Sequence, residues 1–192
     1  MKLKAIDITM AAMFAALMAI GANLTSMITI GTVPITLTTF FCVMAGLILG
    51  SKLGAISMSV YALVGLIGAP VFAQFSGGPG IIFKSTFGFI LSYILAAYVV
   101  GKIAEKNPTK KGFIIAALVG MAVNYVFGTN WMYAALKLWA EAPEGFSYGM
   151  AWAWMLAPLP KDILLSVFAG AVAPRFISAI RKNSSTLNRK AA

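Results

Sequence analysis

The sequence predicts an all-α membrane protein with six transmembrane helices, and three observations support this fold class. Of the 192 residues, 60% are hydrophobic and only 10% are charged, with a mean hydropathy of +0.90. Soluble domains carry roughly 25% charged residues, so this chain has too little polar surface for a water-exposed fold. Apolar runs recur along the chain, and Lys and Arg gather between alternate runs.

The apolar runs are close to the length that a membrane helix needs, which is about 20 residues. The breaks between them contain turn-forming residues, as at Gly50-Ser51-Lys52, Gly77-Gly78-Pro79-Gly80 and Asn107-Pro108. The spans expected from these runs are Ile6–Ala22, Ile35–Leu49, Gly54–Phe72, Ile81–Val100, Phe113–Phe127 and about Ile163–Ile180.

The region between the fifth and sixth runs, from Gly128 to Pro160, has a less regular pattern. It contains all four tryptophans of the chain, and tryptophan is enriched at membrane interfaces. We therefore expect short interfacial helices or a lid here. A seventh span around Tyr148–Leu156 is the alternative, although that run is short.

The distribution of basic residues decides between six and seven spans. If the N-terminus is cytoplasmic and the chain crosses six times, twelve of the 15 Lys and Arg residues fall in cytoplasmic segments. This distribution satisfies the positive-inside rule with both termini in the cytoplasm, and it requires an even number of spans. The sequence thus predicts a multi-pass protein of the cell membrane.

The net charge of +10 is explained by the same distribution. Basic residues at the cytoplasmic side are attracted to anionic lipid, so the charge does not indicate nucleic-acid binding. The last residues are polar and lack periodicity, as in disordered segments. We expect one transmembrane domain over residues 1–181 and a disordered cytoplasmic tail over residues 182–192.

One stretch nearly matches the phosphate-binding loop of ATPases. Gly78 is followed at the usual spacing by Lys84 and Ser85, but Phe83 replaces the second glycine. Such a loop must follow a strand, whereas this stretch follows an apolar run. The chain has no histidine, which excludes the usual catalytic triad. A Ser-Lys hydrolase using Ser76 or Ser85 with Lys84 is conceivable, but the sequence favours a protein that is not an enzyme and has no cofactor.

Lys84 and Asp162 are the unusual charges, because both lie just inside apolar runs near the predicted outer face. An ionisable residue in a membrane segment is by default a functional-site hypothesis. A pocket containing both suits a small amphipathic molecule: Lys84 would bind a carboxylate and Asp162 would accept hydrogen bonds from N–H groups. Alternatively, Lys84 extends to the interface, Asp162 caps the last helix, or the two residues pair with each other.

Two further features have both a binding and a packing interpretation. Asn124 and Tyr125 lie in the fifth run, where they either contact a ligand or form hydrogen bonds between helices. Ala11, Ala15 and Ala19 recur every four residues and share one helix face. That face permits close approach of another helix, from this protein or from a partner.

Longer motifs are similar to those of a known family. They are Val33-Pro34-Ile35-Thr36-Leu37, the run from Gly65 to Ala73 with Gly77-Gly78-Pro79-Gly80 after it, Thr86 with Gly88 and Phe89, and Leu159-Pro160-Lys161-Asp162. Together they resemble the BioY family, the biotin-binding membrane S components of energy-coupling factor (ECF) vitamin transporters. The resemblance extends from about Ala11 to Ala173.

The resemblance implies a six-helix fold with a biotin pocket near the outer surface. Energy would come from a membrane coupling protein and two ATP-binding subunits, and the alanine face of Ala11, Ala15 and Ala19 would dock the coupling protein. The implied substrate-binding residues are Lys84, Thr86, Asn124, Tyr125, Asp162 and Gly77.

The chain departs from the family pattern at three places. Lys84-Ser85 stand where Gly-Pro is usual, Thr38 where a glutamine is usual, and Lys161 where a glycine is usual. These departures affect the pocket and leave its exact ligand open. The alternative function is a stand-alone ion-coupled carrier, which usually has a titratable residue at mid-membrane and an internal repeat. The sequence shows no such repeat.

Overall fold

The structure, a computed structural model, is a helical bundle with one small hairpin. It describes the backbone of residues 4–190 and the side chains of residues 4–180. The helices are α1 (Ala5–Asn23), α2 (Thr38–Ile67), α3 (Phe87–Lys106), α4 (Lys110–Leu138), α5 (Tyr148–Leu156) and α6 (Leu159–Lys190). The strands β1 (Thr29–Ile30) and β2 (Val33–Pro34) pair antiparallel, and two short 3-10 turns follow α2, namely η1 (Ala73–Phe75) and η2 (Pro79–Phe83).

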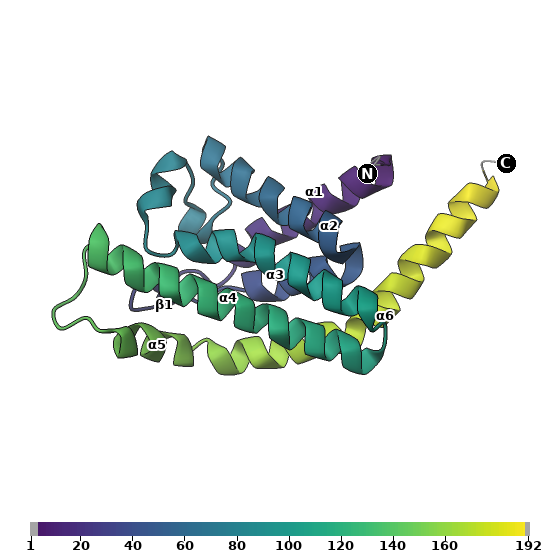
Figure 1. The fold of residues 1–192 in the computed structure, drawn as a ribbon. Helices are drawn as coiled ribbons and strands as arrows, with labels where there is room; N and C mark the ends of the chain where they lie inside the picture. Colours follow the sequence, from purple (N-terminus) through teal and green to yellow (C-terminus); the bar gives the residue numbers. More distant parts are fainter. Residues whose placement is uncertain (1–3, 191–192) are drawn as a thin grey trace.

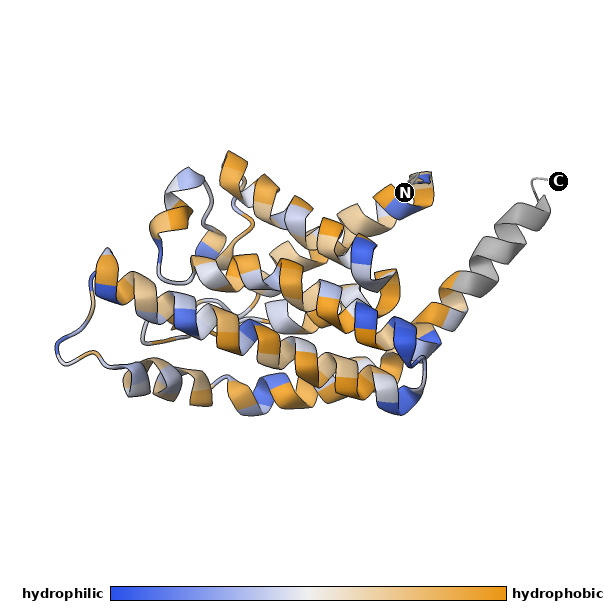
Figure 2. Cartoon of the chain, in the orientation of Figure 1, coloured by the Kyte–Doolittle hydropathy of each residue, from blue (hydrophilic) through white to orange (hydrophobic). Residues whose placement is uncertain are grey.

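Five helical segments are long and apolar enough to cross a membrane. They are Ala5–Asn23, Thr38–Ile67, Phe87–Lys106, Lys110–Leu138 and Leu159–Ile180. Figure 2 shows hydrophobic residues along the lengths of these helices, with hydrophilic residues more frequent at their ends and connections. The predicted all-α membrane fold is confirmed at this level.

Helix α2 is interrupted at Gly50, where φ is 80° and ψ is 178°. A Cβ atom on Gly54 would lie only 3.1 Å from the Cα atom of Gly46. In a straight helix two residues eight positions apart are separated by about 12 Å along the axis. The two halves of α2 therefore fold back on each other, and Gly50 provides the positive φ that this turn requires. The break lies where Gly50-Ser51-Lys52 predicted one.

Glu105 of α3 holds this turn in place. The Ser51 backbone N–H donates to Glu105 Oε1 at 2.7 Å, and the Ser51 hydroxyl donates to Oε2 at 3.1 Å. The first N–H groups of a helix have no partner within the helix, so this carboxylate caps the second half of α2 from outside. The contact also joins α2 to the end of α3.

The two ends of the bundle differ in the segments that they contain. In Figure 1 the start of α1, the α3–α4 turn and the far part of α6 lie at one end. The β1–β2 hairpin, the segment after α2 that holds the 3-10 turns, and the α4–α5 connection lie at the other. The hairpin, the 3-10 turns and the α4–α5 connection thus lie together at one end of the long helices.

Helix α4 is longer than the span predicted from the sequence, which ended at Phe127. The helix continues to Leu138, because Met132, Ala135 and Leu136 keep one face buried. Asn130 does not end it, since its amide donates to the Val126 carbonyl at 2.7 Å within the same helix. Helix α5 corresponds to the short helix expected after the fifth span. The backbone of α6 continues as helix to Lys190, and the predicted division into a domain over 1–181 and a disordered tail over 182–192 stays a prediction.

Candidate functional site

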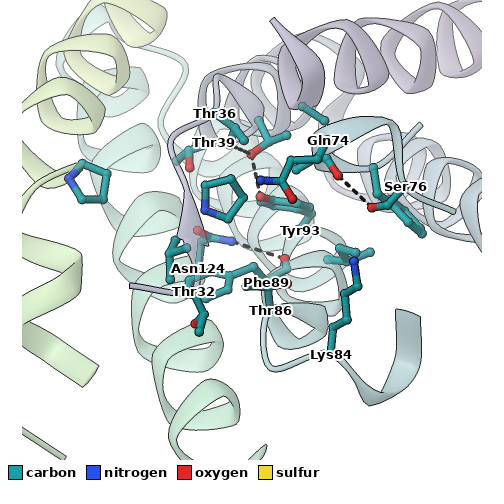
Figure 3. Close-up of a pocket in the computed structure, with 18 of the residues that line it drawn as sticks. Thr32, Thr36, Thr39, Gln74, Ser76, Lys84, Thr86, Phe89, Tyr93 and Asn124 are labelled. Carbon is teal, nitrogen blue, oxygen red and sulfur yellow. Dashed lines mark hydrogen bonds between the residues drawn. The ribbon is translucent and has the colours of Figure 1, made fainter. Parts of the chain in front are cut away.

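A cavity of about 160 Å³ lies at the end of the bundle that carries the irregular segments. The hairpin contributes Thr32 to its wall, the start of α2 contributes Thr38 and Thr39, and the segment after α2 contributes Gln74 and Lys84. Helix α3 adds Phe89, Ile90 and Tyr93, helix α4 adds Asn124 and Tyr125, and the first turn of α6 adds Lys161 and Asp162. Figure 3 shows ten of the lining residues labelled around this space.

Asp162 is the buried anion of the cavity, with only 4% of its surface exposed. Its Oδ2 atom accepts a hydrogen bond from the Tyr125 hydroxyl at 2.8 Å and a longer one from the Thr39 hydroxyl at 3.5 Å. Its Oδ1 atom lies 2.8 Å from the Lys161 ammonium but accepts no well-aligned hydrogen bond. Oδ1 is thus held by the Lys161 ammonium, and its second lone pair can still accept a hydrogen bond from a ligand donor.

Lys161 connects this carboxylate to the chain that follows the hairpin. Besides contacting Asp162, its ammonium donates a hydrogen bond to the backbone carbonyl of Thr36, two residues after β2. The Lys161 side chain is 30% exposed and lines the cavity. The Lys161–Asp162 pair therefore links the first turn of α6 to the segment that forms one wall.

A row of hydroxyl groups lines the wall near α2 and α3. The Thr38 hydroxyl is hydrogen bonded to the Thr36 hydroxyl at 2.6 Å and to the Tyr93 hydroxyl at 2.6 Å. A hydroxyl can donate or accept, so this row can adapt to either kind of ligand group. Thr38 replaces the glutamine usual in the family that the sequence resembles, and it joins this row.

Lys84 approaches the cavity from the segment after η2. Among the residues that the structure describes, no acidic side chain lies within ion-pair distance of Lys84. Trp139 anchors this segment, because its indole N–H donates to the Phe83 carbonyl at 2.8 Å. The stretch that resembled a phosphate-binding loop thus forms a 3-10 turn, one extended residue at Lys84 and a turn that leads into α3.

A strained turn closes another side of the cavity. Gln74 and Phe75 have φ values of 60° and 52°, a region that non-glycine residues rarely occupy. The Ser26 hydroxyl accepts from the Gln74 N–H at 3.0 Å, and the Asn23 side chain accepts from the Phe75 N–H at 2.6 Å. These two bonds from the end of α1 hold the turn and direct Gln74 toward the cavity.

Five of the six substrate-binding residues predicted from the sequence line this one cavity: Lys84, Thr86, Asn124, Tyr125 and Asp162. The sixth, Gly77, is not among the lining residues. A Cβ atom on Gly77 would lie 2.2 Å from the Ala69 carbonyl oxygen, so this glycine permits close packing of two chain segments.

The packing interpretations of these residues can also be compared with the structure. Lys84 and Asp162 share the cavity but do not form an ion pair with each other, because Asp162 pairs with Lys161. Asn124 donates to the Ser92 hydroxyl at 2.6 Å and more weakly to the Phe89 carbonyl (Figure 3). It therefore joins α4 to α3 and also faces the cavity.

The alanine face of α1 is turned largely toward the rest of the bundle. Ala11 is buried, and its carbonyl accepts a hydrogen bond from Ser57 at 2.7 Å. Ala15 and Ala19 are partly buried and pack against the core. Ala12 and Ala16, one position further along, are exposed. The three predicted alanines thus pack within the protein and lie beside an exposed row of small residues.

Several lining residues were not predicted from the sequence. Lys161 and Thr38 were noted only as departures from a family pattern. Thr36, Thr39 and Tyr93 are among the lining residues that were not singled out for binding. A cluster of threonines directly before an apolar run was the available signal. Among the described residues, no group of His, Cys, Asp and Glu side chains could hold a metal ion.

Comparisons with known proteins identify relatives across nearly the whole chain. The chain is 48% identical over 186 residues to a putative biotin transporter BioYB of Bacillus subtilis, covering 94% of this chain and 92% of the relative. It is 34% identical over 178 residues to a probable biotin transporter BioY of Lysinibacillus sphaericus, covering 92% and 89%.

The same fold occurs in the crystal structure of the S-component for biotin from an ECF-type ABC transporter. The TM-score is 0.78 at 21% identity, covering 91% of this chain and 94% of the other. The model of the BioY family matches residues 1–182. This chain therefore belongs to the BioY family.

Proposed function

We propose that this protein binds biotin in the cavity between the hairpin and the helix ends, as the substrate-capture subunit of an ECF-type transporter in the cell membrane. Relatives across nearly the whole chain are named as biotin transporters. The observation that carries the proposal is the buried Asp162 carboxylate, held by Lys161 and Tyr125 in a cavity that also contains Lys84.

The groups of the cavity complement those of biotin. The ureido ring of biotin carries N–H donors, and Asp162 Oδ1 is placed to accept from one of them. The anionic tail of biotin would lie toward Lys84, whose ammonium has no acidic partner among the described residues. Phe72, Phe89 and Ile90 supply apolar walls for the rest of the molecule.

The membrane topology that fits this proposal has six spans with both termini in the cytoplasm. The two halves of α2 would form separate spans, and the first, Thr38–Leu49, is only about 18 Å long at 1.5 Å per residue. A bilayer core is about 30 Å thick, so this short half leaves room within the membrane for the cavity. The basic α3–α4 turn and the termini would lie on the cytoplasmic side.

Transport would require partner proteins, because the stretch 78–85 contains a 3-10 turn in place of a phosphate-binding loop. We propose a membrane coupling protein and two ATP-binding subunits, with α1 as the docking helix. Ala15 and Ala19 keep part of their surface outside the bundle, and Ala12 and Ala16 extend that surface. Ala11 would act through packing against Ser57. Ala16→Trp should leave biotin binding unchanged and abolish uptake with the partners present.

Equilibrium binding to the purified protein tests the proposal. Wild type should bind biotin tightly, and Asp162→Asn should weaken binding by at least about 100-fold, because it replaces a charged acceptor in a buried position. Lys137→Met is a matched control, since Lys137 is exposed on α4 and does not line the cavity. Absence of biotin binding by wild type, or equal binding by Asp162→Asn, would contradict the proposal. Uptake into liposomes by this chain alone would instead support a stand-alone carrier.

A further inference from the structure

The cavity contains two lysines, and their surroundings differ. Lys84 is exposed and has no acidic partner among the described residues. Lys161 is partly buried, and its ammonium contacts both the Asp162 carboxylate and the Thr36 carbonyl. One lysine is thus free to receive an anionic ligand group, and the other is already occupied by the protein.

The contacts of Lys161 join two parts of the cavity that come from distant segments. Asp162 lies in the first turn of α6, whereas Thr36 follows the β1–β2 hairpin and precedes α2. The hairpin has a second contact with this side of the protein, because a Cβ atom on Gly31 would lie 2.3 Å from the Trp154 ring of α5. Lys161 therefore provides the polar attachment of this wall to α6.

The contacts of Asp162 also depend on Lys161. Tyr125 and Thr39 both donate to Oδ2, and Lys161 is the only positive group near Oδ1 among the described residues. A buried carboxylate that loses its cation is destabilised. Its side chain would then turn toward other donors, and the orientation that offers Oδ1 to a ligand would no longer be maintained.

We propose that Lys161 is a positioning residue for substrate binding, with a role separate from that of Lys84. It holds the Asp162 carboxylate as an acceptor and attaches the segment around Thr36 to α6. It does not receive the carboxylate of the substrate. This inference rests on the proposed biotin site.

The wall that Lys161 attaches belongs to the ligand site, because Thr36 and Asp162 line the same cavity of about 160 Å³. The hairpin wall is a short irregular segment attached by few side chains, and Lys161 is the charged one among them.

Two ligands that differ at the end of the tail, one with a carboxylate and one with an uncharged ester, separate the roles of the two lysines. Biotin carries a carboxylate, and biotin methyl ester has the same ring without the charge. Lys84→Met should weaken biotin binding about 10-fold and leave binding of the ester nearly unchanged, because it removes only the partner of the carboxylate. Lys161→Met should weaken both ligands equally, by roughly 10- to 100-fold, mainly through faster dissociation.

Two further measurements distinguish positioning from a general loss of structure. Lys161→Arg keeps the charge and the donors, and should restore affinity for both ligands to within about threefold of wild type. A spin label on Thr29→Cys should report a more mobile hairpin in Lys161→Met than in Lys84→Met. Thr29 is exposed in β1, and the native Cys42 is buried and will not react.

Lys161→Gln keeps the test decisive if Lys161→Met does not fold. It retains an amide donor for Thr36 but no charge, and should show an intermediate, ligand-independent loss of affinity. The inference is overturned if Lys161→Met or Lys161→Gln weakens binding of biotin much more than binding of the ester, since Lys161 would then contact the carboxylate of biotin itself. It is also overturned if affinity and label mobility do not change. If wild type binds neither ligand, the proposed function fails instead.

Discussion

Tyr125→Phe removes a single hydroxyl group from the buried carboxylate while keeping the aromatic ring. The Tyr125 hydroxyl donates to Asp162 Oδ2 at 2.8 Å, and the only other hydrogen bond to that oxygen, from Thr39, is 3.5 Å long. A hydrogen bond to a charged group contributes about 1.5–3 kcal/mol. Because Tyr125 orients the acceptor that the ligand uses, we expect biotin affinity to fall by roughly 10-fold or more.

Isothermal titration of the purified variants with biotin measures this effect. Thr39→Val is the matched control, because its longer bond contributes little and its removal should change affinity by less than about threefold. Both variants should keep the secondary structure of wild type. If Tyr125→Phe binds biotin as tightly as wild type does, Asp162 is not oriented by Tyr125 for ligand binding, and the role assigned to this pair is wrong.

Two other substitutions test the packing that supports the site. Glu105→Ala removes the cap on Ser51 and should lower the free energy of unfolding by about 1–2 kcal/mol. The unfolding temperature should fall while biotin affinity stays unchanged. Lys102→Ala is the control, because Lys102 lies 4.0 Å from Glu105 in an exposed pair and its removal should change the unfolding temperature little. At Gly88, a Cβ atom would lie 2.2 Å from the Trp131 side chain. Gly88→Val should therefore push α3 away from α4, lower stability and weaken biotin binding. Unchanged stability and binding would show that this close contact is not needed.

Most of the helical framework followed from the sequence because apolar length and turn residues determine it. The break at Gly50 was predicted from Gly50-Ser51-Lys52, and the positive φ of Gly50 explains why a glycine stands there. The end of α4 was not predicted, because the pattern of apolar residues becomes less regular from Gly128 onward. The Asn130 side chain is satisfied within the helix, and the apolar face around Met132 continues.

The β1–β2 hairpin could not be predicted from a sequence pattern. Each strand has only two residues, which is too short for the alternation of polar and apolar side chains that marks a strand. The hairpin is defined instead by contacts with distant residues, such as Gly31 with Trp154. Such contacts depend on the tertiary fold.

The cavity was predicted in part, because charges inside apolar runs are costly and therefore conspicuous. Lys84 and Asp162 stood out for that reason, and both line the cavity. The partner of Asp162 was not predicted, because consecutive residues on a helix point in different directions and do not usually pair. The contact of Lys161 with Thr36 joins two segments that are far apart in the sequence. The alanine face was predicted by spacing, but spacing does not tell whether a small face points inward or outward.

Native mass spectrometry of the protein as purified from cells grown with biotin tests the central claim most directly. Wild type should carry one bound molecule with the mass of biotin, and Asp162→Asn, purified in the same way, should carry none. If neither protein retains biotin when it is added in excess, or if both retain it equally, the buried carboxylate beside Lys161 does not form a biotin site.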